Sequence, residues 1–547
     1  MRNGNVGQNH DIFWVRVKRY TCPDVVLYDA KTNGNWGTAT NWIGATGRGA
    51  GLPTIADRAV IKKPVAVNVT NAKAADVVLD QHSGNTGQLI LDAGKELVVS
   101  RTVCKTTNGS TYTATGENDI VFNSTSGAGL GALVMGSHDG KNKATVNFYT
   151  KSTGKKNETS VAQYVGTPFN DETNILYNWY NSWVYKIVYD NKVIGWELMH
   201  EGDGMTPFKG YCVFSADAWG NDAGHTYWMQ GTLVSSENHT CSGLNWESGS
   251  GAANGNNENL LANSWMAPIK IKAMQTTDFV NADATIYIFK STDSTSYLEE
   301  GFAGNYITTT VGTCEETDLI PAMQSFSVFT TGNTASVTLD YNRIVYAPAL
   351  AGTTPTPNKA PKRAGASEDE ADKMRLFVRT EDGYGDMLYM WEREDFTEGF
   401  ENGWDGRKLF GESYAPQLYA ITPDGEMAVN CVPDWEGTVL GFRKGTEDDV
   451  YTFTFEYNGE NTWYLNDLRE QTSTLISSES RYMFMASDED MVARFIVSRT
   501  PIHHVATGID LSTGRGQQSA VRKIVINDHV FIIRNGQMYD VTGVTVK

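Results

Sequence analysis

The sequence predicts an all-β, multi-domain protein. We expect an N-terminal β-solenoid or β-roll, two β-sandwich domains of the jelly-roll or immunoglobulin-like kind, and a small C-terminal β tail. Composition is the first reason, because the 25 Tyr, 21 Phe and 14 Trp are side chains that suit a pleated, half-buried surface. The 53 Gly are the second, since tight turns need glycine. At 547 residues the chain has room for roughly three to five domains.

Residues 31–150 contain short apolar triplets separated by glycines. The triplets are Val77-Val78-Leu79, Leu89-Ile90-Leu91 and Leu97-Val98-Val99. Short strands at a regular spacing with glycine corners are typical of a solenoid, in which each strand forms part of a stacked rung. A meander of β-hairpins is the alternative interpretation of the same pattern.

Two longer regions, 160–346 and 374–500, alternate apolar and polar residues as half-buried strands do. Tyr185–Tyr189 and Thr285–Phe289 are examples in the first region, and Tyr451–Phe455 is one in the second. Asp424-Gly425 and Asn458-Gly459 are dipeptides that favour hairpin turns. Each region is therefore predicted to be a separate β-sandwich.

Residues 347–373 are predicted to be a disordered linker, because they combine four prolines with a charged run that cannot contribute to a packed core. At the other end, Phe13-Trp14-Val15 is followed by Arg16, Lys18 and Arg19. These charges interrupt the apolar stretch that a secretory signal peptide requires. We therefore expect 1–30 to be the remnant of a longer chain.

The chain carries 45 basic and 64 acidic residues, a formal net charge of −19. Such a charge disfavours binding to nucleic acid, which needs clustered Lys and Arg. No apolar run reaches the roughly 18 residues that a membrane helix requires. The six cysteines are widely spaced and form no CxxC pair, so isolated thiols are preferred over a zinc or redox motif, and disulfides stay open.

Several motifs in the first 350 residues resemble those of large, multi-domain bacterial surface proteins. The N-terminal motifs are Trp36, Asn41-Trp42 and Leu52-Pro53, followed by repeated strands after glycines. Further along the chain they are Tyr164–Phe169, Lys209–Phe214, Ser264-Trp265 with Ala267-Pro268, and Ile320–Val328. The resemblance implies a structural or adhesive protein of the cell surface.

The tail at 507–547 resembles the C-terminal sorting domain of the type IX secretion system. Three apolar segments, near 523–526, 530–533 and 538–541, precede an ending with Tyr539, Asp540, Gly543, Val546 and Lys547. The resemblance implies export by secretion and anchoring machinery to the exterior or outer-membrane surface of a Gram-negative bacterium. A small hairpin that completes the preceding domain is the alternative.

Catalytic motifs are not evident in the sequence. His200-Glu201 is followed by Gly204, where a metalloprotease would place its second histidine. The glycines at 127–131 lack the Lys-Ser/Thr of a phosphate-binding loop. We therefore expect no enzyme activity and no cofactor, although Asp382, Asp386 and Asp203 leave a structural calcium ion open.

Four tryptophans beside turn residues are candidates for an exposed glycan platform: Trp36, Trp42, Trp404 and Trp463. Packing in a domain core is the alternative for each. The preferred hypothesis is a non-catalytic, exported surface protein of structural or adhesive function, with a glycan or a host surface as its partner. Two alternatives are the carbohydrate-binding accessory region of a longer secreted enzyme, and a hydrolase with a carboxylate pair in 160–346.

Overall fold

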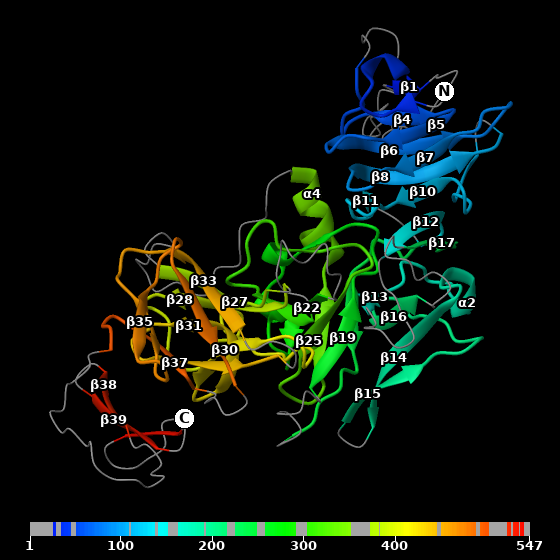
Figure 1. Cartoon of the computed structure of the whole chain (residues 1–547). Coiled ribbons are helices and arrows are strands. Elements are labelled where there is room, and N and C mark those ends of the chain that lie inside the picture. Colours follow the sequence, from blue (N-terminus) through cyan, green and yellow to red (C-terminus); the bar gives the residue numbers. More distant parts are fainter. Residues whose placement is uncertain are drawn as a thin grey trace, which may run out of the picture. The chain divides into compact units, whose positions relative to one another are not determined.

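The computed structural model of the chain is built mainly from β-strands (Figure 1). This confirms the all-β class that the composition predicts. The structure describes residues 26–28, 34–44, 51–108, 111–136, 140–150, 162–190, 193–215, 225–248, 257–290, 304–351, 372–381, 383–445, 450–487, 493–502, 522–526, 529–534 and 537–540. The predicted N-terminal remnant, apart from 26–28, and most of the predicted linker lie outside these residues.

The contacts divide the chain into two compact units. Unit 1 contains residues 1–148, 169–171 and 228–236, and unit 2 contains 149–168, 172–227 and 237–547. The predicted regions 160–346 and 374–500 both contribute to unit 2, and the predicted domain boundaries stay predictions.

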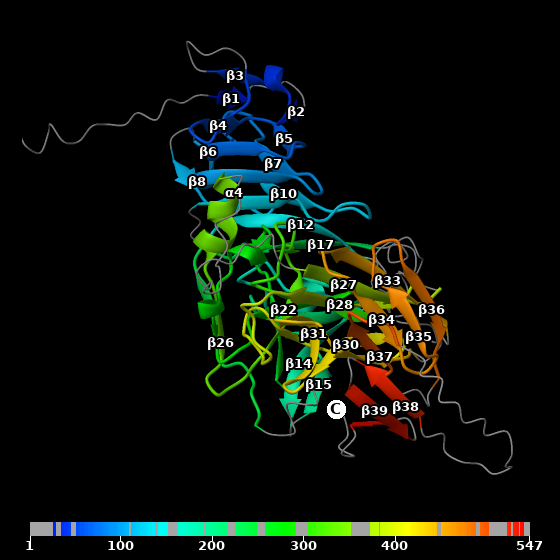
Figure 2. The same ribbon diagram turned by 90° about the vertical axis from the view of Figure 1, so that its left-hand side faces the viewer.

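Unit 1 contains two sheets between which the chain alternates (Figure 2). The first sheet runs β11 (Ala132–Met135), β8 (Glu96–Thr106), β6 (Ala72–Asp80), β4 (Arg58–Ile61), β1 (Val26–Tyr28) and β3 (Trp42–Gly44), with β9 (Tyr112–Thr113) beside β8. The second runs β17 (His225–Thr232), β12 (Lys143–Thr150), β10 (Ile120–Asn123), β7 (Gln88–Leu91), β5 (Pro64–Val67) and β2 (Gly34–Asn35). A 3₁₀ turn, η1, covers Ala39–Asn41.

Most neighbouring strands of the two sheets pair in parallel, unlike the antiparallel strands of a hairpin meander. The pairs β1 with β3 and β8 with β9 are antiparallel. In the first sheet Ala59 is opposite Val77, and in the second Val65 is opposite Leu89. Alternate residues of β4, β5 and β7 are buried, and so are Val77–Leu79 and Leu97–Val99. The apolar triplets of the sequence therefore contribute to the core of unit 1. A Cβ at Gly87 would lie 2.1 Å from the Ile61 carbonyl oxygen, which explains a glycine at this corner.

The first part of unit 2 is a set of small antiparallel sheets. One runs β13 (Gln163–Val165), β16 (Tyr211–Ser215), β14 (Ser182–Asp190) and β15 (Val193–Leu198). A second runs β18 (His239–Ser242), β26 (Ser336–Leu339) and β21 (Phe279–Val280). A third runs β19 (Glu258–Ala262), β25 (Ser325–Phe329), β22 (Thr285–Lys290) and β23 (Asn305–Thr310). A fourth pairs β20 (Ile269–Lys270) with β24 (Leu319–Ile320). The helical segments are α2 (Ile175–Asn178), η4 (Ile271–Ala273), η5 (Thr276–Asp278), η6 (Asn342–Tyr346) and α4 (Ala347–Ala351).

The second part of unit 2 is one continuous sheet rather than the two facing sheets of the predicted sandwich. Its order is β35 (Thr472–Leu475), β34 (Tyr464–Asp467), β37 (Phe495–Ser498), β32 (Thr438–Arg443), β30 (Gln417–Thr422), β31 (Gly425–Val432), β28 (Gly385–Glu392), β27 (Asp372–Arg379), β33 (Val450–Asn458) and β36 (Arg481–Met485), with β29 (Gly406–Arg407) beside β31. Strands from all along this order bury one shared core, which includes Met374, Trp435, Phe453 and Phe495. The sheet therefore curls around this core, and Tyr389, Trp391, Val429 and Cys431 of β28 and β31 belong to a second, smaller buried cluster.

The tail forms a three-stranded antiparallel sheet in the region where the sequence predicts strands. Its strands are β38 (Arg522–Ile526), β39 (His529–Arg534) and β40 (Gln537–Asp540). Tyr539 and Asp540 lie in β40, opposite Ile532 and Phe531, whereas Gly543, Val546 and Lys547 lie outside the described residues. In the part of the chain that the structure describes, we find no helix with the length and apolarity needed to span a membrane.

Candidate functional site

The four candidate platform tryptophans are packed rather than presented to solvent. Trp36 and Trp42 are each 1 % exposed, with ring centroids 4.9 Å apart, and Trp463 is fully buried. Trp404 is partly buried between Phe396 and the Arg393 guanidinium. The expectation of exposure is therefore wrong for Trp36, Trp42 and Trp463. Neighbouring turn residues do not keep an indole in water when its large apolar surface can reach a core.

The candidate calcium ligands have other partners. Asp386 forms a buried ion pair with Lys408 and accepts a hydrogen bond from the Leu418 backbone nitrogen at 2.6 Å. Asp203 accepts from the His200 backbone nitrogen at 2.8 Å, and Asp382 lies outside the described residues. Across the described ranges, no group of three or more His, Cys, Asp or Glu side chains is arranged to hold a metal ion.

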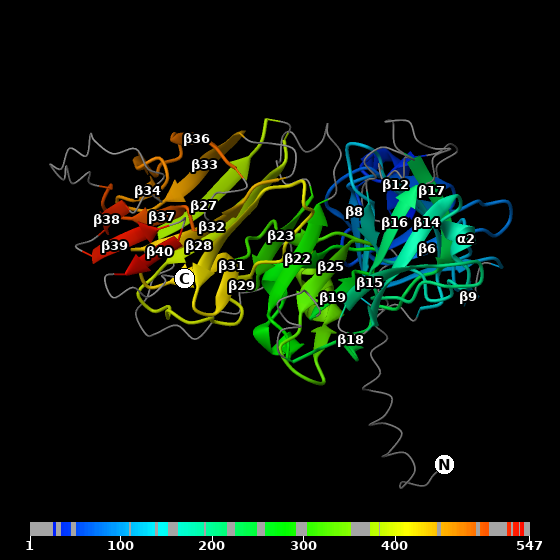
Figure 3. The ribbon, with the colours of Figure 1, turned by 60° about the horizontal axis from the view of Figure 1, so that its bottom comes forward.

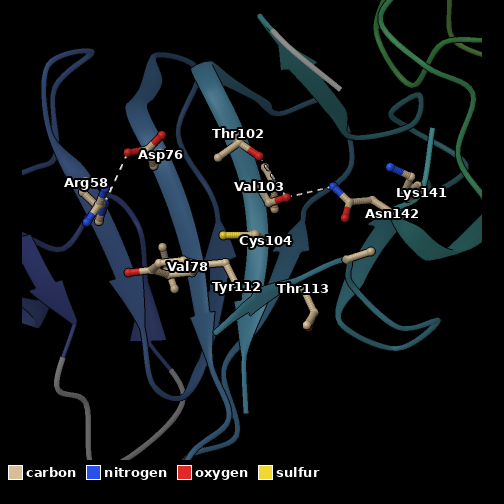
Figure 4. Close-up of a pocket in the computed structure, with 11 residues that line it drawn as sticks. Arg58, Asp76, Val78, Thr102, Val103, Cys104, Tyr112, Thr113, Lys141 and Asn142 are labelled. Atoms are coloured by element: carbon tan, nitrogen blue, oxygen red, sulfur yellow. Dashed lines mark hydrogen bonds and ion pairs between the residues drawn. The ribbon is translucent and has the colours of Figure 1, made fainter. Parts of the chain in front are cut away.

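A cavity of about 540 Å³ opens on unit 1 over β4, β6, β8 and β9 (Figure 4). Its lining includes Arg58, Asp76, Cys104, Tyr112 and Asn142. Asn142 fixes one wall, because its amide donates to the Val103 carbonyl oxygen at 2.8 Å and accepts from the Thr115 backbone nitrogen at 3.0 Å. This side chain ties the loop before β12 to β8.

The charge of this cavity centres on the buried carboxylate of Asp76. Arg58 Nε lies 3.3 Å from Asp76 Oδ2, and Arg101 Nε lies 2.9 Å from Oδ1. Two guanidinium groups thus surround one carboxylate. Burial, assisted by Asp76, raises the pKa of Cys104 to about 11, so the thiol is protonated at neutral pH and is a poor nucleophile.

A second cavity, of about 620 Å³, lies in unit 2 between β14, β18 and the segment 203–211. Phe208 adopts a positive φ of 63°, which is rare for a bulky residue, and its backbone nitrogen donates to Ser264 Oγ at 2.7 Å. The Phe208 ring stacks on the His239 imidazole with centroids 3.9 Å apart. Burial lowers the pKa of His239, so the imidazole facing this cavity is neutral at pH 7.

The two cavities lack the carboxylate pair that glycoside hydrolysis needs. Among the described residues, the unit 1 cavity is lined by one carboxylate, Asp76, and the unit 2 cavity by one, Asp203. Buried carboxylates elsewhere in 160–346 are engaged: Asp278 with Arg343 and Asp283 with Arg407. Among the described residues, neither cavity therefore offers a carboxylate acid–base pair.

One partly buried carboxylate, Glu258, was not identified from the sequence. Glu258 Oε1 accepts hydrogen bonds from Tyr306 Oη at 3.1 Å and Ser327 Oγ at 2.5 Å. Burial raises its pKa, and the two hydrogen bonds only partly oppose that effect. The signal for it is weak, because a glutamate at the start of β19 resembles an ordinary exposed strand end. Glu258 lines neither cavity.

The cysteines of the structure support the prediction of isolated thiols. Cys104, Cys212, Cys241, Cys314 and Cys431 are all free, and the last four are buried. Cys22 lies outside the described residues.

Comparison with known proteins gives one informative similarity. The chain is 27% identical over 516 residues to the minor fimbrium subunit Mfa5 of Porphyromonas gingivalis, a match that covers 85% of this chain. The chain spans 38% of the length of that relative. No protein-family model matches the chain, and no solved structure matches it either.

Proposed function

We propose that this chain is a non-catalytic structural or adhesive component of the bacterial cell surface. The similarity to a fimbrial subunit carries the proposal, because it runs through 85% of the chain rather than through one short motif. The all-β fold and the net charge of −19 agree with an exported protein that must stay soluble outside the cell.

The finer parts of the proposal concern the two ends of the chain. Residues 31–150 are proposed to act as a β-solenoid spacer, since each rung of a solenoid contacts only its neighbours and such an array extends without a large core. The tail, 507–547, is proposed to be the address that directs export and anchoring. Its support is the ending Tyr539-Asp540, Gly543 and Val546-Lys547 together with three short strands.

The address is tested by removing it in the bacterium that makes the protein. Full-length protein, a variant lacking 524–547, and a variant with those residues in scrambled order are compared by cell fractionation and surface labelling. The scrambled tail keeps length and charge, so it controls for both. We expect full-length protein at the surface and both variants retained inside the cell. Normal surface amounts of either variant would overturn the address, and absence of the full-length protein from the surface would overturn the surface role.

A further inference from the structure

The segment 174–183 of unit 2 is aromatic, uncharged and exposed. Its sequence, Asn-Ile-Leu-Tyr-Asn-Trp-Tyr-Asn-Ser-Trp, contains no Asp, Glu, Lys, Arg or His, although 20% of the whole chain is charged. It includes α2 and leads directly into β14 (Figure 3). Four of its ten side chains are aromatic.

The backbone of this segment is held in place by buried anchors. Ile175 and Trp179, one turn apart, are 2 % and 1 % exposed, and the Trp179 ring packs against Tyr227 with centroids 5.0 Å apart. Asn174 caps α2 by accepting from the Leu176 backbone nitrogen at 3.0 Å. The Ile175 backbone nitrogen donates to the Asp203 carbonyl oxygen at 2.8 Å. The turn is therefore organised before any partner binds.

With Ile175 and Trp179 facing inward, the other aromatic side chains of the turn face water. Tyr177 is 77 % exposed and Tyr180 is 69 % exposed. Tyr177 lies in α2 and Tyr180 lies two residues after its end at Asn178, so the two rings are three residues apart in one short turn. Trp183, at the start of β14, is 39 % exposed. Exposed rings of this kind add up to roughly 300–450 Å² of apolar surface, given the 150–250 Å² that one aromatic side chain buries.

We propose that Tyr177 and Tyr180, with Trp183, form a binding surface for a neutral polysaccharide. The C–H faces of a sugar ring are apolar and stack on aromatic rings, while its hydroxyl groups pair with polar side chains such as the amide of Asn181. The absence of charge in the segment matches an uncharged ligand. A patch of this size is often functional in a monomer, yet it is well short of the roughly 800 Å² per partner of a stable protein interface. This inference rests on the proposed surface function in one respect, because a protein on the cell surface can reach a polysaccharide outside the cell. Binding of the polysaccharide itself does not depend on the export route.

The full chain, purified as one piece, is tested by electrophoresis through gels that contain neutral polysaccharides (glucan, mannan, xylan or galactan) or the anionic polymer polygalacturonate. We expect at least one neutral polymer, and not polygalacturonate, to slow the protein. The variant Y177A/Y180A should bind at least about tenfold more weakly than the unmodified chain. The variant Y177F/Y180F should still bind, because its aromatic rings remain. Y112A removes a tyrosine that is 56 % exposed in unit 1 and should bind as the unmodified chain does.

Three outcomes would overturn the proposal. They are the absence of binding to every neutral polymer, equal binding by Y177A/Y180A, and a dimer in solution that Y177A/Y180A converts to a monomer. The last would make the surface an interface between two copies of the chain. The variant lacking 524–547 should keep its binding, so a failed export test leaves this proposal standing. Because Tyr177 and Tyr180 are exposed, an unchanged circular dichroism spectrum and melting temperature would show that Y177A/Y180A is folded.

Discussion

Glu258 shows how one partly buried ionisable side chain makes the stability of the protein depend on pH. Its carboxylate accepts from Tyr306 and Ser327 inside unit 2, and burial raises its pKa. The folded chain therefore holds a proton at this site more tightly than the unfolded chain does. Above the folded pKa the carboxylate is ionised and folding carries its desolvation cost. That cost is relieved as the pH falls through the folded pKa.

The substitution Glu258→Gln should therefore stabilise the protein at neutral and alkaline pH, because a neutral amide avoids the desolvation of a charge. The gain over the unmodified chain should shrink as the pH is lowered from alkaline values through the raised pKa of Glu258, where the glutamate takes up its proton. Melting temperatures of both chains across this range measure the effect. Glu479→Gln, at an exposed position, is the control and should show no such trend. A constant difference at every pH would contradict the assignment.

Residue environments were the part of the structure that the sequence predicted least well. Trp36 and Trp42 follow turn residues, yet each is buried against the other. A turn fixes the backbone path but not which way a large ring points, and the ring's apolar area favours the interior. Tyr177 and Tyr180 show the converse, because only the inward packing of Ile175 and Trp179 reveals that these rings are exposed.

At the scale of elements, the alternating segments of the sequence predict where strands lie but not which strands pair. Asp424-Gly425 lies at a hairpin, since Thr422 is opposite Gly425 in β30 and β31. Asn458-Gly459 does not, because β33 pairs with β27 and β36 rather than with the next strand. There a Cβ on Gly459 would lie 2.3 Å from the Asp372 carboxyl carbon. This glycine permits a close approach between distant segments, which no local pattern reports.

Gly441 in β32 is a second glycine whose role depends on a neighbouring strand. It lies opposite Tyr419 of β30, and an added Cβ would come 2.0 Å from the buried Tyr419 ring. Gly441→Ala should therefore destabilise the protein by about 1–3 kcal/mol through overpacking. Calorimetric unfolding of the full chain measures the loss.

Gly195→Ala is the matched control, because Gly195 is also a strand glycine, in β15, and its added Cβ would meet only Val188 at an ordinary 3.5 Å. It should unfold close to the temperature of the unmodified chain. Equal effects of the two alanine substitutions would show that strand propensity, and not contact with Tyr419, sets the cost.

At the scale of the whole molecule, the sequence predicts two separate sandwich regions, but the structure joins them within unit 2 by a seam. We define the seam as the contacts of 282–290 and 304–312 with Gly385 and 402–416. The buried Asn305 amide donates to the carbonyl oxygens of Gly385 at 2.8 Å and Pro416 at 2.9 Å. Such polar side chains look like ordinary turn residues in the sequence, so the seam could not be predicted from local patterns.

Further polar contacts cross the same seam. Asn402 Oδ1 accepts from the Ala284 backbone nitrogen at 2.7 Å, and Arg407 Nε lies 3.0 Å from the buried carboxylate of Asp283. The Gly312 backbone nitrogen donates to the Gly403 carbonyl oxygen at 2.7 Å. Because buried polar groups lose their partners when the two parts separate, the seam should resist opening.

This leads to a prediction about a chain cut between the two regions. A site for a specific protease inserted between Asn358 and Lys359 would allow cleavage of the folded protein into two fragments. We expect the fragments to elute together in size-exclusion chromatography, because the seam and not the covalent link holds them.

Introducing Asn305→Ala and Arg407→Ala together should weaken the seam, since each removes donors to buried acceptors. The cut double variant should then separate into two peaks. Arg469→Ala, which removes a surface pair with Glu470 of little energetic weight, should leave the cut fragments together. Separation of the fragments without any substitution would mean that the two regions are independent domains, as the sequence alone predicts.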